Sequence, residues 1–95
     1  MYARVVRFTG VSPERIDGLV SEIKESGGPP AGVPATGLKM LVDEAQSTAV
    51  VILSFETEED LRKGDEVLDQ MDASETPGTR ASVDNCEVKV EMDVS

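Results

Sequence analysis

The chain contains no histidine and no tryptophan, and Cys86 is its single cysteine. Without histidine, it lacks the usual side chain that activates a serine or cysteine nucleophile near neutral pH. One cysteine forms no disulfide within the chain. A reactive thiol would need a neighbouring cation or helix N-terminus, and the position of Cys86 in an alternating pattern predicts an inert core residue instead. These absences favour binding and interaction over catalysis, without deciding between them.

Basic residues are also few, since 9 lysine and arginine residues stand against 19 acidic ones for a net charge of -10. Such a surface repels phosphate backbones and anionic lipids, so we expect neither nucleic acid nor a membrane as partner. No apolar run approaches the length of about 20 residues that a membrane span needs. The chain starts at Met1-Tyr2-Ala3-Arg4 rather than with a basic and then apolar signal region, and we therefore expect a cytoplasmic protein.

The length of 95 residues fits one domain, 1–95, and is too short for two separate cores. A domain of this size buries only about 60 to 65% of its unfolded surface. Any further apolar surface that it exposes therefore favours a binding partner.

Hydrophobic periodicity and turn residues predict four strands and two helices. Ser12-Pro13 supplies an N-cap and a first-turn proline, and Gly27-Gly28 ends the helix that follows. Thr57 with Asp60 resembles a capping box for the second helix. The predicted elements are strands 2–8, 38–43, 48–55 and 81–94, a helix over 13–26, and a helix from the Thr57 cap to residue 73.

The order βαββαβ predicts a ferredoxin-like α+β fold, a four-stranded antiparallel sheet with two helices on one face. In this topology the first and third strands are central and the other two lie at the edges. The third strand has apolar side chains on both faces, Val50 and Ile52 on one and Val51 and Leu53 on the other, and the first strand has the same property. Because two helices cover only one face, the second apolar face predicts a homodimer formed by face-to-face packing.

The predicted fourth strand, 81–94, alternates between apolar and charged side chains in its C-terminal part. We expect the apolar set to face the core, as in an edge strand with one solvated face. The odd spacing between Val83 and Cys86 predicts a bulge or bend. A strand this long overhangs a shorter partner strand, so we predict that Val90–Val94 contacts the partner subunit.

Three stretches of the chain carry a resemblance to a known group of proteins. They are Ala3-Arg4-Val5-Val6-Arg7-Phe8-Thr9-Gly10, the proline- and glycine-rich loop before Leu41-Val42-Asp43, and Phe55-Glu56-Thr57-Glu58-Glu59-Asp60-Leu61. On these residues the chain resembles the dimeric α/β-barrel superfamily, in the branch of the antibiotic-biosynthesis monooxygenases, over essentially its whole length. The resemblance implies two sheets packed face to face in a homodimer, helices outside, and a ligand cavity between helices and sheet in each subunit.

The chain also departs from this family. Members that degrade haem use a histidine ligand with asparagine and tryptophan nearby, whereas this sequence has Asn85 alone of that set. Relatives often carry tryptophan at the end of the third strand, where this sequence has Phe55. We therefore expect no haem and no other cofactor. The implied activity is that of a cofactor-independent monooxygenase acting on a small organic molecule, and no residue here can be matched to its chemistry.

Tyr2, Arg4 and Arg7 are the candidate ligand-binding residues. The two arginines lie on opposite faces of the first strand, so one of them points toward a covered face or a cavity. There its planar guanidinium would bind an anionic ligand. The alternative is an ion pair with a carboxylate of a neighbouring strand or of the partner subunit. Tyr2 would donate a hydrogen bond to the ligand, or else it is a partly buried residue at the strand end.

A loop and a series of carboxylates are further candidate sites. Loop 27–37 has three prolines and four glycines, but it lacks the lysine of a phosphate-binding loop and follows a helix, so we expect a rigid connection or a cavity lid. The carboxylates lack calcium-loop spacing, and two stand four residues before Arg62 and Lys63, as on a solvated helix face; we expect no metal site. These acidic residues are Glu56, Glu58, Glu59, Asp60, Asp65, Glu66, Asp69 and Asp72.

Three interpretations of the function remain open from the sequence. The protein is a monooxygenase-like enzyme, a non-catalytic small-molecule-binding protein, or an interaction module without an internal cavity. A large cavity lined by polar groups would separate the first two from the third, and turnover would separate the enzyme from the binder.

Overall fold

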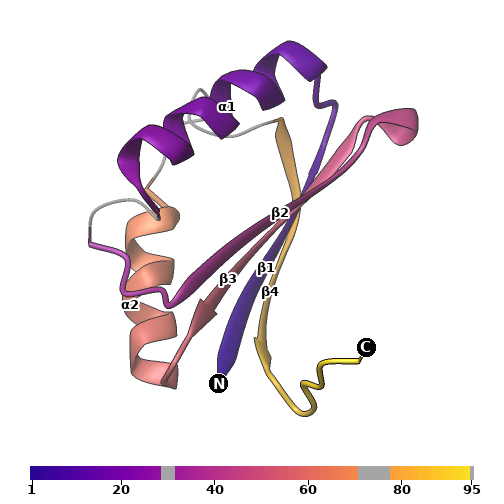
Figure 1. Ribbon diagram of the computed structural model, residues 1–95. Helices are drawn as coiled ribbons and strands as arrows, with labels where there is room; N and C mark the ends of the chain where they lie inside the picture. Colours follow the sequence, from indigo (N-terminus) through magenta and orange to yellow (C-terminus); the bar gives the residue numbers. More distant parts are fainter. Residues whose placement is uncertain (29–31, 71–77, 95) are drawn as a thin grey trace.

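The computed structural model describes residues 1–28, 32–70 and 78–94. The strands form one four-stranded antiparallel sheet in the order β2-β3-β1-β4, and both helices lie on the same face of it (Figure 1). The elements are β1 (Tyr2–Thr9), α1 (Pro13–Ser26), β2 (Gly37–Asp43), the short 3-10 helix η1 (Glu44–Gln46), β3 (Thr48–Phe55), α2 (Glu58–Leu68) and β4 (Thr79–Glu87). The predicted ferredoxin-like α+β fold, with β1 and β3 at the centre of the sheet, is confirmed.

Local capping determines where α1 begins and ends. The Ser12 hydroxyl accepts a hydrogen bond from the backbone N–H of Arg15 at 3.3 Å, and Pro13 occupies the first turn. Gly27 ends the helix with φ 80°, a left-handed conformation that glycine adopts without strain. The predicted bounds of α1 are confirmed. Among the described residues, neither helix has the length and apolar character needed to cross a membrane.

The second helix is shorter than predicted. Thr57 caps α2 by accepting a hydrogen bond from the N–H of Asp60 at 3.1 Å, as the sequence indicates. The helix ends at Leu68 rather than near residue 73, and residues 71–73 lie outside the described part of the chain. Midway along it Gly64 is buried, and a Cβ at this position would lie 2.7 Å from two ring carbons of Phe55. The missing side chain lets α2 approach the sheet closely.

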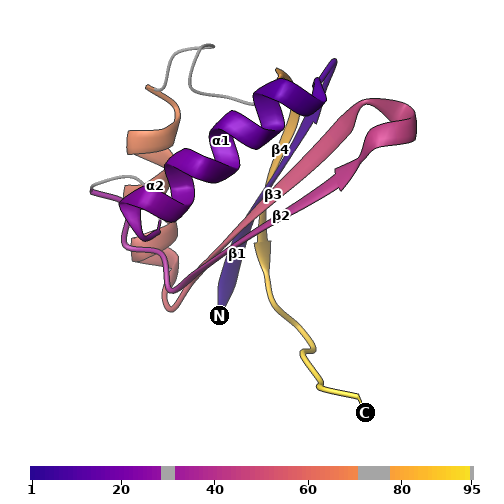
Figure 2. The ribbon, with the colours of Figure 1, turned by 45° about the horizontal axis from the view of Figure 1, so that its top comes forward.

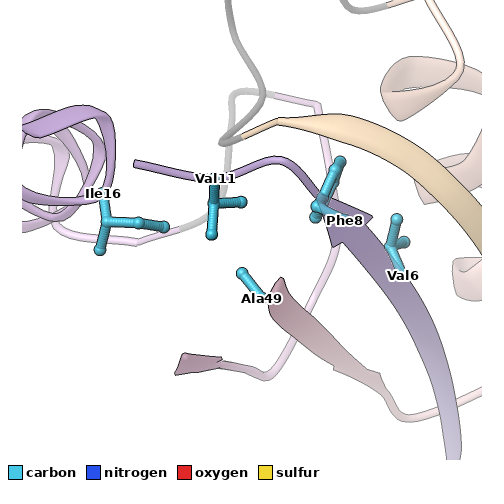
Figure 3. Packing of buried hydrophobic residues seen from close by; sticks show 5 residues of the cluster. All are labelled: Val6, Phe8, Val11, Ile16 and Ala49. Atoms are coloured by element: carbon cyan, nitrogen blue, oxygen red, sulfur yellow. The ribbon is translucent and has the colours of Figure 1, made fainter. Parts of the chain in front are cut away.

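Two clusters of buried apolar side chains fill the space between the sheet and the helices. The first joins β1, β3 and α1, and Figure 3 shows its side chains in a row from α1 to β1. It consists of Val6, Phe8, Val11, Ile16 and Ala49. The second lies under α2 and consists of Val33, Leu53, Phe55 and Leu61. Both clusters therefore lie on the helix side of the sheet.

The opposite side of the sheet, which we call the open face, is covered by neither described helix (Figure 1). Arg4, Val6 and Phe8 of β1 are buried on the helix side, so the alternate residues of β1 point to the open face. By the pairing register the open face comprises Lys39 and Leu41 of β2, Val50 and Ile52 of β3, Ala3, Val5 and Arg7 of β1, and Ser82, Asp84 and Cys86 of β4. The prediction that both central strands are apolar on both faces is confirmed.

The fourth strand stops well before residue 94. It ends at Glu87, and the N–H of Val88 still donates to the C=O of Met1 at 2.9 Å. The predicted strand 81–94 is therefore wrong beyond Glu87, because its ladder with β1 ends at the Tyr2–Glu87 pair. Residues 88–94, which we call the tail, leave the sheet on the side away from the helices (Figures 1 and 2). The exposed apolar residues of the tail are Val90, Met92 and Val94.

The irregularity in β4 lies elsewhere than predicted. The register between β1 and β4 shifts between Arg7 and Phe8, where Ala81 is the extra residue of β4, whereas Val83 to Cys86 pair regularly. The odd spacing of Val83 and Cys86 places them on opposite faces, Val83 toward the helices and Cys86 on the open face. Cys86 is exposed in this chain, so its assignment to the core is wrong.

Candidate functional site

Arg4 is a buried charge on the helix side of the sheet, with 2% of its surface exposed. Its Nη1 lies 2.5 Å from Oδ1 of Asp65 and donates a hydrogen bond to it. Its Nη2 donates to Oδ1 of Asp69 at 3.1 Å. Both terminal nitrogens therefore bind carboxylates of α2. The structure thus shows an ion pair for Arg4, with helix rather than strand carboxylates.

The local sequence explains this pairing. Asp65 and Asp69 are four residues apart and follow Leu61 at the same interval, so the three side chains lie along one side of α2. Leu61 is buried against β3, and the close approach at Gly64 brings the carboxylates down to β1. Of the Asp65 side chain only 21% is exposed. Asp65 is therefore largely covered, whereas the Asp69 side chain is 57% exposed.

Two residues of β4, Arg80 and Asn85, also bind these carboxylates. We call the whole group the polar cluster. It consists of Arg4, Asp65, Asp69, Arg80 and Asn85. Asn85 Nδ2 donates to Oδ2 of Asp65 at 2.7 Å. Arg80 Nη1 donates to Oδ1 of Asp69 at 3.2 Å. Two guanidinium groups thus balance two carboxylates. The cluster ties α2 to a central strand and to an edge strand at once.

One atom of the polar cluster is left without a partner. Nε of Arg4 is buried, and no described group hydrogen-bonds to it. Leaving a buried polar hydrogen unpaired costs about 1–3 kcal/mol. The carboxylates that neutralise Arg4 also accept hydrogen bonds from both of its terminal nitrogens, which would otherwise bind an anionic ligand. The cluster therefore acts as a structural clamp that holds α2 on the sheet.

Tyr2 lies on the same face of β1 as Arg4, at the start of the strand. Its ring is half-buried and packs against the second apolar cluster, which includes Leu53 and Phe55. Tyr2 thus takes the position of a partly buried residue at the strand end.

Arg7 points to the open face, away from both Tyr2 and Arg4. The side chain is exposed, and within the described residues it makes no hydrogen bond or ion pair. It borders a shallow hollow of about 240 Å³ at the turn end of the β2–β3 hairpin. The other lining residues are Leu41, Val42, Asp43, Gln46, Thr48, Ala49 and Val50. The structure therefore does not bring the three predicted ligand-binding residues together.

A second, smaller hollow lies on the helix side, between the start of α1 and the β2–β3 hairpin. Its volume is about 50 Å³, and Val11, Ile16 and Val42 are among the residues that line it. This space has room for a few water molecules but not for an organic substrate.

The remaining described acidic residues of α2 pair with basic residues or face solvent. The described residues contain no group of three or more side chains that would hold a metal ion. On α2, Glu58 pairs with Arg62 at 2.6 Å and Glu59 with Lys63 at 3.5 Å. Both pairs have the predicted four-residue spacing of a solvated helix face.

The signal for the partners of Arg4 is present in the sequence but is easily missed. Asp65 and Asp69 repeat the spacing of the apolar residues of α2, which distinguishes them from acidic residues elsewhere on the helix. Asn85 and Arg80 carry no such signal, because their side of β4 depends on the bulge at Ala81.

Comparison with protein-family models, with curated proteins and with solved structures gives no match for this chain.

Proposed function

We propose that this protein is a homodimeric interaction module in which the open faces of two copies pack against each other. The observation that carries the proposal is the apolar centre of the open face. Val5, Val50 and Ile52 are only half-buried there, and Leu41 is 50% exposed. Contiguous apolar surface of this kind on a small domain favours a protein partner.

The arrangement of the helix side also supports this function. The guanidinium group of Arg4 is bound by two carboxylates of α2, and the hollow near α1 is small. The open face, by contrast, is a large surface that neither described helix covers. In the dimeric α/β-barrel superfamily, which the sequence resembles, sheets pack in this way; membership of its monooxygenase-like branch is part of the same proposal.

A second function is favoured by the hollow beside Arg7. An unpaired guanidinium next to Leu41 and Val50 suits a small organic molecule with an apolar body and an anionic group. Turnover of such a molecule would identify a monooxygenase-like enzyme. Binding without turnover would identify a carrier or sensor.

Sedimentation equilibrium over a concentration series tests the proposed dimer. We expect the wild type to be a dimer at micromolar concentration and Ile52→Glu to be a monomer with an unchanged circular dichroism spectrum. Ser21→Glu adds the same charge on the exposed surface of α1 and should leave the dimer intact. A wild type that remains monomeric throughout the series would overturn the proposal.

A further inference from the structure

Two opposite charges lie at the two edges of the open face, in the same row of the sheet. Lys39 of β2 pairs in register with Ile52, Ile52 with Val5, and Val5 with Asp84 of β4. The row therefore reads Lys39, Ile52, Val5, Asp84 from one edge to the other. Its two central members are apolar and its two ends carry opposite charges.

These two charges have no partner among the residues that the structure describes. Lys39 and Asp84 are three strand spacings apart, about 14 Å, which is too far for an ion pair. Both side chains are exposed, and neither makes a hydrogen bond or ion pair within the described residues. The lysine and the aspartate beside the apolar centre are therefore available to form ion pairs with another molecule.

We infer that a second copy docks on the open face about a two-fold axis parallel to the strands, and that Lys39 of each copy pairs with Asp84 of the other. Such an axis, running between β3 and β1, exchanges β2 with β4 and β3 with β1 across the interface. Lys39 then faces the partner's Asp84, and Ile52 faces the partner's Val5. The inference rests on the proposed dimer and specifies its geometry.

The other simple two-fold axis fits the charges poorly. An axis running across the strands stacks each strand on its own copy, so β2 lies on the partner's β2. Lys39 would then lie beside the partner's Leu41 and near the like-charged Lys39 of the partner subunit. Asp84 would lie on the partner's β4, beside the partner's Ser82. Covering a charge without an opposite charge is strongly unfavourable. Charge complementarity therefore selects the axis parallel to the strands.

The dimensions of packed sheets permit the pair. Sheets pack face to face about 10 Å apart, and the flexible four-carbon stem of lysine reaches across most of that gap. Strands of the two sheets then run within about 30° of each other. The row from Lys39 to Asp84 of one sheet therefore stays over the same row of the other. By the same rotation Arg7 lies over the partner's β3, one strand and one row from the partner's Asp43.

Charge reversal tests the pairing, with dissociation constants from sedimentation and folding monitored by circular dichroism. Lys39→Asp places like charges together at both edges of the dimer, and so does Asp84→Lys. Each should weaken the dimer by about 10-fold to 100-fold, because facing like charges are costly at an interface. The double variant restores two opposite pairs and should dimerise within about threefold of the wild type.

Mixing the two single variants provides a stricter test. One copy then carries two acidic groups at these positions and the other two basic groups, so the mixture should form heterodimers in preference to either homodimer. Lys24→Asp and Glu22→Lys make the same charge changes on the exposed surface of α1 and should leave the dimer unchanged.

The outcomes separate this inference from the dimer itself. Single reversals that leave the dissociation constant of a dimeric wild type within about twofold would overturn the Lys39–Asp84 pairing while the dimer stands. A monomeric wild type would overturn both.

Discussion

Gly64 of α2 lies directly over the ring of Phe55, so close that a Cβ would be 2.7 Å from two ring carbons. Gly18 of α1 is also helical, but a Cβ there would meet nothing within 4 Å. The two glycines can therefore be compared directly. Alanine improves the helix propensity of both positions but clashes only at Gly64.

We expect Gly64→Ala to lower the free energy of unfolding by about 1–3 kcal/mol, because overpacking forces the helix away from the sheet. Gly18→Ala should raise it by up to about 1 kcal/mol. Urea denaturation followed by circular dichroism measures both. A stabilised Gly64→Ala variant would show that α2 does not approach β3 so closely.

Removing the charge of Arg4 should be far more damaging than removing that of an exposed arginine. Arg4→Met leaves Asp65 partly buried without its cation, and we expect a loss of about 3–5 kcal/mol. Arg62→Met deletes the exposed pair with Glu58 and should cost at most about 0.5 kcal/mol.

A double variant tests the reason for the Arg4 effect. Adding Asp65→Asn to Arg4→Met removes the unpaired negative charge of Asp65. The double variant should recover part of the lost stability in the same urea titrations. Equal stabilities for Arg4→Met and Arg62→Met would show that the polar cluster does not clamp α2.

Val5 and Val51 separate dimerisation from folding. Val5 points to the open face, whereas Val51 packs against the first apolar cluster on the helix side. Val5→Asp should therefore give a folded monomer, and Val51→Asp an unfolded or strongly destabilised chain. Sedimentation together with circular dichroism distinguishes the two. The reverse pattern would mean that the open face, not the helix side, holds the core.

The tail should contribute to the dimer because it leaves the sheet toward the open-face side and carries Val90, Met92 and Val94 exposed. Deleting residues 91–95 should weaken the dimer more than it changes the circular dichroism of the monomer. The combined substitution Glu91→Gln and Asp93→Asn removes only the charges of the deleted segment and serves as the control. An unchanged dissociation constant after the deletion would show that the tail is solvated in the dimer.

The sequence predicts best what depends on neighbouring residues. The start and end of α1 are encoded within a few positions by Ser12, Pro13 and Gly27, and the structure confirms them. The faces of β3 follow from strict alternation and are also confirmed. Both cases need no knowledge of distant parts of the chain.

Features set by distant partners were missed. The end of β4 depends on where its pairing with β1 ends, which the pattern of Val90 to Val94 cannot reveal. Arg4 and Asp65 are 61 residues apart, and their contact requires the packing of α2 on β1. The side taken by Cys86 depends on the register of β4, which the bulge at Ala81 adjusts.

The pairing of β1 with β4 has a consequence for how the protein folds. Tyr2 lies opposite Glu87, so two strands separated by nearly the whole described chain must find each other. Contacts so distant in sequence slow folding, because a long loop must close before they form. During synthesis β1 waits with one edge unpaired until β4 has left the ribosome, and that edge can meanwhile accept a strand from another copy. Expression at low temperature and low yield per cell should therefore favour folded protein over aggregate.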